Sequence, residues 1–445
     1  MSAPATLPAQ YTIFKIVSQD LQNSIDLNMG QFRVTGIDFF ENILSPYVHG
    51  GTVITSSSGA VEDEKLGRLT GISDILTVGA QLLVRIEPQL GKVIDYARGI
   101  DDYKVLYVTK VSRPIRTSTS ETIAVEFTSK IGYMNETRKV TQRFNGPISA
   151  SAKKIIEQYL ELSDDQVEVT KTGNSQSFAG LNKRPLDILI DLAVNSIPES
   201  TSNPGYVCFE SIGKFNFVSL DKLTTQDSEF TYTYSGVMEA TEELQNESNN
   251  FKISKFSVKK DQDLLSQLRT GVYASKSFFL NTFTYEFTEI DMSVNQGKLL
   301  KDPKVKTGLG DFAEIPEVIS KSFTKDSVHR INTTIIDIGA EKGKIELDDK
   351  NNNPELYISA ASMRYNILFS QKVSITIPCN TDLHAGSTIK LILEDISDQK
   401  EKGVNQRQSG RYIIQALRHH FDGNSSFTFL DLIRDSYGLH FTKAS

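Results

Sequence analysis

Six histidines and two cysteines are the side chains of this sequence best suited to metal binding or acid–base chemistry. None of the histidines has HExxH, His-x-His or His/Cys ligand spacing. Cys208 and Cys379 lie 171 residues apart, too few for a disulfide framework or a structural zinc site, and we expect two buried thiols. The sequence thus predicts no metal and no cofactor. The histidines are His49, His329, His384, His419, His420 and His440.

The adjacent pair His419-His420 comes after a predicted strand, and we expect it to form a turn. Neighbours on a strand point to opposite faces, so both rings cannot easily bind one ion. No G-x-S-x-G elbow, Walker A loop or G-x-G-x-x-G turn occurs, and Gly308-Leu-Gly310 lacks the third glycine. The carboxylates are numerous, but none belongs to a recognisable catalytic motif, so the sequence predicts no catalytic residues and no enzyme.

The composition limits the classes of partner. The chain has 445 residues, 39% apolar and 23% charged, with a net charge of −7. This length predicts several domains, and the acidic balance disfavours a broad nucleic-acid-binding surface. Tryptophan, a common stacking platform for sugars, is absent. We find no secretory signal and no apolar run of about 18 residues that could span a membrane, so we expect a protein made and kept in a soluble phase.

Short runs rich in β-branched and aromatic residues predict a strand-dominated chain. Four predicted helices are fewer and separate, and their apolar stripes are best explained as core packing. Polar breaks are expected at 51–68, 171–180, 196–205, 236–250, 340–353 and 396–409. The helices are expected at 147–162, 185–197, from Asn353-Pro354 onward, and at 261–269. The clearest strands are 81–87, 104–110, 122–128, 372–378, 388–394, 411–417 and 426–433.

Two parts of the sequence follow the same plan. Gly79 precedes three predicted strands, and Gly386 precedes three more at offsets of 306 to 308 residues. Residue identity between the two parts is poor. The constant offset nevertheless favours a duplicated β-domain with a long insertion between the copies. Within that insertion, aromatic runs such as Phe283-Thr-Tyr-Glu-Phe287 predict a β-rich segment, whose alternation would equally suit a sheet face packed on a neighbouring subunit.

Several strings, in this order, make the chain recognisable. Phe39-Phe-Glu-Asn-Ile-Leu-Ser-Pro46 is followed by Gly180-Leu-Asn-Lys-Arg-Pro-Leu-Asp-Ile-Leu189, Gly205-Tyr-Val-Cys-Phe-Glu210 and Phe215-Asn-Phe-Val-Ser-Leu-Asp221, and later by Ser409-Gly-Arg-Tyr-Ile-Ile-Gln-Ala-Leu-Arg-His-His420. Together they resemble the baseplate hub protein of contractile-tailed, myovirus-type bacteriophages, which is related to the hub part of type VI secretion spike proteins. No single string is diagnostic, and residues 225–350 match least.

The resemblance implies a mainly β fold with α+β insertions, in which two tail-tube-like β-barrel domains accompany two inserted domains. It implies a homotrimeric ring that adapts a three-fold central spike to a six-fold tail tube. The expected partners are the spike protein, tail tube or tube-initiator proteins and wedge proteins of the baseplate, while DNA passes through the lumen without specific binding. The expected location is the tail baseplate of the virion, after assembly in the host cytoplasm.

The expected division of the chain follows from this architecture. We expect an N-terminal arm (1–19), a first barrel (20–118), an inserted α/β domain (119–222), a β-rich middle domain (223–349), a second barrel (350–438) and a tail (439–445). Because the sequence stops soon after the second barrel, we expect the spike and any lysozyme domain to be separate chains. The expected subunit or tube interface residues are Ile389, Leu391, Leu393, Tyr412 and Ile414.

Two other functions stay open at this point. A receptor- or carbohydrate-binding tail module would fit the strand-rich composition, although the repeat and the missing tryptophan disfavour it. A cell-wall hydrolase is disfavoured further, because no catalytic motif stands out.

Overall fold

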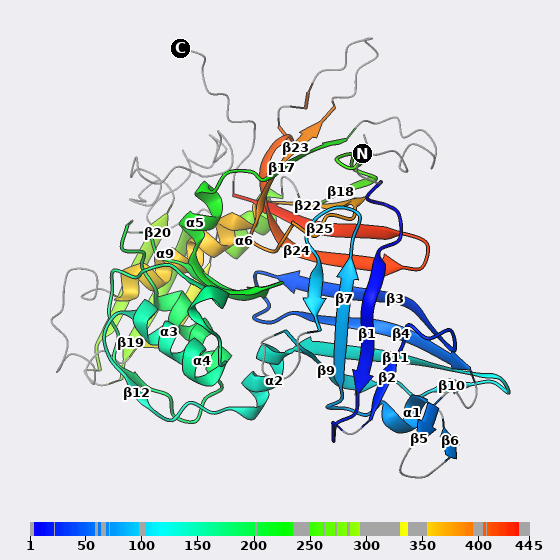
Figure 1. Ribbon diagram of the computed structural model, residues 1–445. Coiled ribbons are helices and arrows are strands. Elements are labelled where there is room, and N and C mark those ends of the chain that lie inside the picture. Colours follow the sequence, from blue (N-terminus) through cyan, green and yellow to red (C-terminus); the bar gives the residue numbers. More distant parts are fainter. Residues whose placement is uncertain are drawn as a thin grey trace.

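Strands dominate the computed structural model, as the sequence predicts, and most of them belong to one large sheet (Figure 1). The helices gather mainly to one side of this sheet. The structure describes residues 4–21, 23–57, 61–63, 68–70, 72–97, 104–200, 203–234, 249–260, 263–271, 274–282, 285–293, 330–336, 354–394, 404–405 and 407–435.

The first half of the large sheet contains six strands, which we call the first set. In sheet order they are β3, β4, β11, β9, β7 and β1. Short strands β2 (Ser24–Asp26), β8 (Ile94–Tyr96) and β10 (Ile115–Arg116) pair at its margins. The bounds are β3 Phe32–Asn42, β4 His49–Ser57, β11 Ser120–Ser129, β9 Leu106–Val111, β7 Gln81–Glu87 and β1 Gln10–Val17.

The other half, which we call the second set, also contains six strands. In sheet order they are β18, β22, β25, β24, β23 and β17. The bounds are β18 Lys255–Lys260, β22 Gln371–Pro378, β25 Ser426–Arg434, β24 Gly410–Asp422, β23 Thr388–Leu393 and β17 Phe230–Tyr234.

The two sets have the same topology. When the six strands of each set are numbered in chain order, their order across the sheet is the same in both sets: second, third, sixth, fifth, fourth, first. One direction differs, because β1 is antiparallel to β7 whereas β17 is parallel to β23. The equal order extends the predicted repeat from three strands to six.

Each set encloses its own core because alternate side chains along each strand point inward. In the first set, Phe14 of β1 and Phe39 of β3 belong to one buried cluster although their strands lie far apart in the sheet. The sheet therefore curves, and Figure 1 shows β1 and β7 crossing β3, β4 and β11 steeply. The described strands do not pair as a closed ring; in the second set, an isolated bridge joins Thr233 of β17 to Lys252, just before β18.

An α/β segment and a smaller sheet surround these two sets. Helices α3 and α4 pack in one apolar cluster with strands β15 and β16, and α9 lies against the sheet of β20, β19 and β21. The helices are α1 Ile72–Ile75, α2 Lys130–Thr137, α3 Ile148–Tyr159, α4 Pro185–Asn195, α5 Leu220–Thr225, α6 Leu264–Thr270 and α9 Pro354–Leu368. The remaining strands are β5 Val61–Asp63, β6 Arg68–Thr70, β12 Arg143–Phe144, β13 Val167–Val169, β14 Phe178–Ala179, β15 Tyr206–Ser211, β16 Lys214–Ser219, β19 Ala274–Asn281, β20 Phe287–Ser293 and β21 Ile331–Ile336.

Some local predictions were wrong. The break expected at 51–68 is largely strand, because β4 continues to Ser57 and β5 follows. His419 and His420 do not form a turn: β24 runs on to Asp422, because pairing with β3 and β25 supplies partners for its backbone. The breaks expected at 236–250, 340–353 and 396–409 lie wholly or mostly outside the described residues.

The pairing also crosses the expected domain limits. β1 lies in the expected arm and β11 beyond the expected first barrel, yet both belong to the first set. β17 and β18 lie within 223–349 and pair with strands of the second set. None of the helices in the described ranges is long and apolar enough to cross a membrane.

Candidate functional site

The two sets meet where β24 pairs with β3. The first residues of β24 pair with β23, and its later residues, from Ala416 to Asp422, pair with Asn42 to Gly36 of β3. One long strand therefore belongs to both sets. Residues almost 400 positions apart in the chain become neighbours here, and we treat this junction as the first candidate site.

One face of the junction carries a half-buried charge cluster. Nδ1 of His420 lies 2.7 Å from Oδ1 of Asp38, and Nε of Arg418 lies 3.6 Å from the same oxygen. The hydrogen bond to Asp38 raises the pKa of His420, against a smaller lowering by burial. The Arg418 guanidinium also lies over the ring of Phe429, 4.1 Å from its centroid, which fixes its direction.

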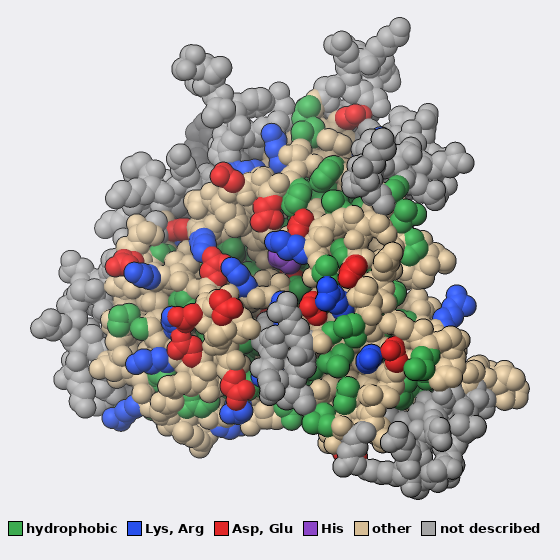
Figure 2. Space-filling model, viewed as in Figure 1, with side chains coloured by type: hydrophobic (Ala, Val, Ile, Leu, Met, Phe, Trp, Pro, Cys, Tyr) green, Lys and Arg blue, Asp and Glu red, His purple; other side chains and the backbone are tan. Residues whose placement is uncertain are grey.

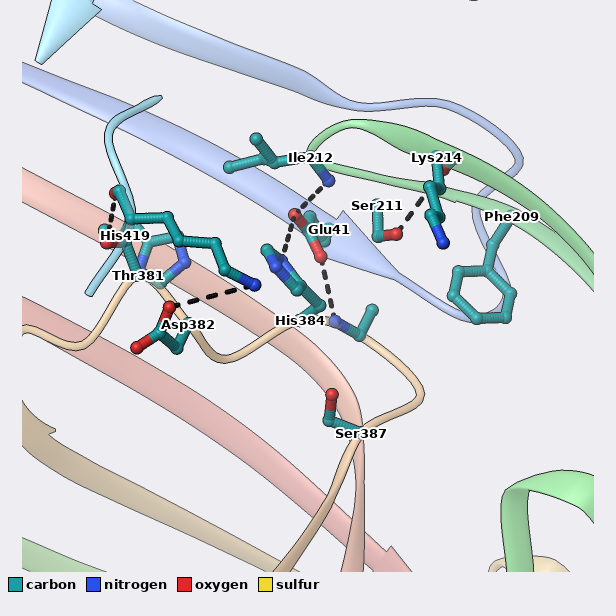
Figure 3. Close-up of polar contacts among 12 residues, drawn as sticks. Glu41, Phe209, Ser211, Ile212, Lys214, Thr381, Asp382, His384, Ser387 and His419 are labelled. Carbon is teal, nitrogen blue, oxygen red and sulfur yellow. Dashed lines mark hydrogen bonds and ion pairs between the residues drawn. The ribbon is translucent and has the colours of Figure 1, made fainter. Parts of the chain in front are cut away.

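The opposite face of β3 presents a buried carboxylate, Glu41 (Figure 3). Its Oε1 accepts from the backbone N–H of Ile212 (2.7 Å), and its Oε2 accepts from the backbone N–H of Ala385 (2.8 Å). Nδ1 of His384 lies 3.6 Å from Oε1. Glu41 thus joins β3 to the turn between β15 and β16 and to the loop that precedes β23.

Burial and charge pairing shift the pKa values of Glu41 and His384 in opposite directions. Burial alone would raise the pKa of Glu41, but His384 and the Ala385 N–H outweigh it, so the pKa of Glu41 falls below its usual range. Burial would lower the pKa of His384, but Glu41 outweighs it and the pKa of His384 rises. Both shifts favour a carboxylate facing an imidazolium, an arrangement that holds three segments together in a low-dielectric interior.

His419 lies beside this pair but behaves differently. Its side chain is fully buried, and its Nδ1 lies 3.0 Å from Oγ1 of Thr428. Burial lowers the pKa of His419 to about 4, so the ring is neutral near pH 7. His419 and His420 point to opposite faces of β24, as expected for neighbours on a strand.

A second buried carboxylate fastens the α/β segment to the first set. Oε2 of Glu210 on β15 accepts from the backbone N–H of Val48 at 2.8 Å and from Oγ of Ser129 at 2.5 Å. In the described part of the chain, no group of three or more His, Cys, Asp or Glu side chains could hold a metal ion. Both cysteines are free and buried, and burial raises the pKa of each thiol to about 12.

The five residues predicted to lie at an interface come together in one place, the interior of the second set. All are buried in a single cluster with strands β22 and β25. The backbone of β23 is also paired within the chain, with β17 on one side and β24 on the other. The role of these residues in contacts between subunits stays a prediction. They are Ile389, Leu391, Leu393, Tyr412 and Ile414.

An exposed apolar face lies on the sheet of β19, β20 and β21. The register places Leu280 opposite Phe287 on one side and opposite Ile335 on the other. Phe287 and Ile335 are 63% and 68% exposed, and Phe278 stacks on Phe287 at 5.5 Å. Apolar side chains gathered on one sheet face are typical of surfaces that bind another protein.

Sequence reasoning missed the junction. Ala385, which donates to Glu41, and His420, which pairs with Asp38, lie more than 340 residues away, and Ile212 lies 171 residues from Glu41, so nothing in the local pattern pairs them. One signal was present: a glutamate inside the apolar run Phe39-Phe40-Glu41 needs a buried partner if that run is a strand in a sheet core.

The chain resembles phage baseplate hub proteins, as its sequence predicts. One such relative is the "Probable baseplate hub protein gp334" of Vibrio phage KVP40 (isolate Vibrio parahaemolyticus/Japan/Matsuzaki/1991). It is 22% identical over 412 residues, which cover 91% of this chain and 90% of that protein. No protein-family model matches the chain.

Two solved structures are similar to this chain at lower sequence identity. The tail protein of Neisseria meningitidis MC58 is 11% identical with a TM-score of 0.49, covering 91% of this chain and 97% of that one. The 43 kDa tail protein of prophage MuSo2 from Shewanella oneidensis is 10% identical with a TM-score of 0.49, covering 95% and 98%. Both scores lie below 0.5, too low to assign a fold or function to this chain.

Proposed function

We propose that this chain is a structural hub protein in the baseplate of a contractile phage tail. The observation that carries the proposal is the pair of six-strand sets with equal strand order, joined through one shared strand. The resemblance to a baseplate hub protein along nine-tenths of the chain supports it. A hub of this kind works by recognition and assembly, so it needs no catalytic group.

Three chains would form a ring with six similar β-domains, because each chain contributes two. Such a ring adapts a three-fold spike to a six-fold tube, starts tube assembly and leaves a passage for DNA. Each set would be one barrel-like domain, with the bridge between Thr233 and Lys252 as a start of closure in the second. This revises the division by residue number: the first domain takes in β1 and β11, and the second takes in β17 and β18.

The net charge of −7 suits a DNA passage, since like charge keeps a duplex from adhering. Acidic and basic side chains are mixed over the face drawn in Figure 2, without a broad basic area. The partners in this proposal are two further copies of the chain, the central spike, tube or tube-initiator proteins and wedge proteins.

Subunit contacts are best placed on the apolar face of β19, β20 and β21, which holds Phe287 and Ile335. An obligate interface typically buries about 2,000–5,000 Å² and is rich in apolar residues. The core residues named above, such as Ile389 and Tyr412, would then act indirectly by keeping the second set in shape.

The test is the mass in solution, measured by light scattering after size exclusion, alone and with the candidate spike protein. We expect about 149 kDa, three times the chain mass of 49.6 kDa. Ile335→Asp should reduce this to a monomer, whereas the control Ile115→Asp, on an equally exposed isoleucine of β10, should not.

A trimer that survives Ile335→Asp would contradict the apolar-face contact but leave the hub proposal standing. A chain that stays monomeric with the spike would contradict the hub proposal itself. Binding on a glycan array would then favour a receptor- or carbohydrate-binding tail module.

A further inference from the structure

The turn before the fourth strand is built the same way in both sets. Gly79 and Gly386 each have a φ of +86°, which favours glycine. The N–H of Gly79 donates to the carbonyl of Val108 (2.8 Å), and the Val108 N–H donates back to the residue after the glycine (2.9 Å). Gly386 and Ile414 make the same two bonds at 2.8 and 2.9 Å. The surroundings of the two turns can therefore be compared position by position.

In the second set, the chain itself covers this turn. A methyl group added to Gly386 would lie 2.7 Å from Cζ of Phe209 and 3.4 Å from Cδ2 of Leu223. These two side chains come from β15 and α5. They share one buried apolar cluster with Ile413 and Ile433, which pair across β24 and β25. An aromatic ring and an aliphatic side chain thus fill the space beside Gly386.

In the first set, the equivalent turn borders a cavity. Tyr107 and Thr128 pair across β9 and β11 at the positions of Ile413 and Ile433. They line a cavity of about 680 Å³ together with Gly79. A methyl group added to Gly79 would make only ordinary van der Waals contact, with the exposed Gln19 side chain nearest at 3.5 Å, instead of overlapping an aromatic ring.

The cavity has a floor of small residues and aromatic walls. Gly50 and Gly51 of β4 line it, as does Tyr107, whose ring stacks on Tyr133 at 4.5 Å. At Gly51 an added methyl would meet only a carbonyl oxygen at 3.4 Å, so this position leaves room for an inserted ring, and the aromatic walls offer it stacked or edge contacts. Charged and polar residues such as Glu126 and Glu136 also line the cavity, but its aromatic side chains suit a ring like the one that fills the second set.

We propose that this cavity binds a segment of a different protein chain, which inserts an aromatic ring beside Gly79 as Phe209 does beside Gly386. A second copy of this chain is a poorer source. In that copy, Phe209 and Leu223 are 2% and 5% exposed, so they are already packed against its own second set and are not available for insertion. The inference rests on the equivalence of the two sets and does not depend on the hub function.

The probe is a synthetic peptide with the sequence of residues 205–212, carrying Cys208→Ser and Phe209→Trp, with both ends blocked. The full chain has no tryptophan, so all indole fluorescence comes from the probe. We expect a saturable blue shift on titration, with one peptide bound per chain. The same peptide with alanine at position 209 should not compete for this site.

Two threonines give a matched pair of variants. Thr109 lines the cavity and Thr12 lies on β1 outside it. Both are exposed, both occupy bulges, and both donate from Oγ1 to a carbonyl of the neighbouring strand. Thr109→Phe should weaken peptide binding at least tenfold, whereas Thr12→Phe should leave it within twofold.

Three results would overturn the proposal: no saturable shift, equal binding by the two threonine variants, or equal competition by the alanine peptide. If Thr109→Phe fails to fold, Gly51→Leu fills the cavity from β4, where an added methyl meets only a carbonyl oxygen at 3.4 Å. If the chain self-associates and the peptide disperses it, the occupant is a second copy and the proposal of a different chain is wrong.

Discussion

Glu41 shows how a charge can be held inside a β-structure. It is 1% exposed, and its two oxygens are occupied by backbone N–H groups from two other segments, with His384 beside them. A buried ion pair adds little net stability compared with apolar packing, but removing one partner leaves the other unpaired and is costly. The pair therefore specifies which segments meet at the junction more than it stabilises them.

Replacing Glu41 with alanine should lower the free energy of unfolding by about 3–5 kcal/mol, because His384 and two amides lose their partner. Glu126→Ala removes the exposed ion pair with Lys110 and should cost less than about 1 kcal/mol. Urea unfolding of the full chain measures both. Equal losses would mean that removing Glu41 does not leave His384 and the two amides unpaired at a substantial cost.

His419 should make stability depend on pH. Its folded pKa of about 4 lies below the ordinary value of 6.5, so the folded state prefers the neutral ring. The stability is fully present above pH 6.5 and is lost as the pH falls toward 4, by at most about 3 kcal/mol at ~1.4 kcal/mol per pKa unit.

His419→Gln removes this titration, so its unfolding free energy should fall less steeply between pH 6.5 and 4 than that of the unchanged chain. Glu41 also loses stability in acid, because its folded pKa is lowered, but His419 is the smallest cause of that lowering, so the Glu41 contribution changes little between the two proteins. Identical slopes from urea titrations across this range would contradict a buried neutral His419.

At the scale of elements, the equivalent glycine turns differ only in what covers them. Both glycines have positive φ, so any side chain is strained at either position by about 1–2 kcal/mol. Beyond that strain, an added methyl at Gly386 would overlap Phe209 at 2.7 Å, whereas one at Gly79 would only touch Gln19 at 3.5 Å. Identical backbone can thus serve as core in one set and as binding surface in the other.

Gly386→Ala should destabilise the chain more than Gly79→Ala, by about a further 1–3 kcal/mol of overpacking. Both substitutions introduce the same backbone strain, so the difference between them measures the packing contribution alone. Chemical denaturation measures the difference. If both substitutions cost the same, the ring of Phe209 can move away easily and the packing difference has no energetic weight.

At the scale of the whole molecule, β24 makes the two sets interdependent. Its residues pair with β23 and β25 of the second set and with β3 of the first. Unfolding either set exposes backbone groups and apolar side chains of the other, so the free energy of unfolding one set includes a loss of stability in the other.

We therefore expect both sets to unfold in one transition. Hydrogen exchange followed by mass spectrometry should give β3 and β24 the same protection and the same response to low urea. Asp38→Asn, which weakens the pair with His420, should lower protection in both strands together. Separate transitions for the two strands would show that the sets are independent domains.

The strand-rich class, three of the main helices to within a few residues, the buried cysteines and the resemblance to hub proteins could all be predicted from the amino-acid sequence. These properties depend on local alternation, helix periodicity and short strings, which are readable along the chain. The glycines at 79 and 386 also marked the repeat correctly, because a positive φ leaves few alternatives to glycine.

Three features depend on long-range pairing and could not be predicted: the junction of β3 with β24, the membership of β1 and β17 in their sets, and the cavity beside Gly79. Strand pairing joins residues that lie hundreds of positions apart, and the pattern of one strand does not name its neighbour. Whether an apolar position becomes core or surface depends on what the rest of the chain brings to it: Phe209 and Leu223 reach one set and not the other.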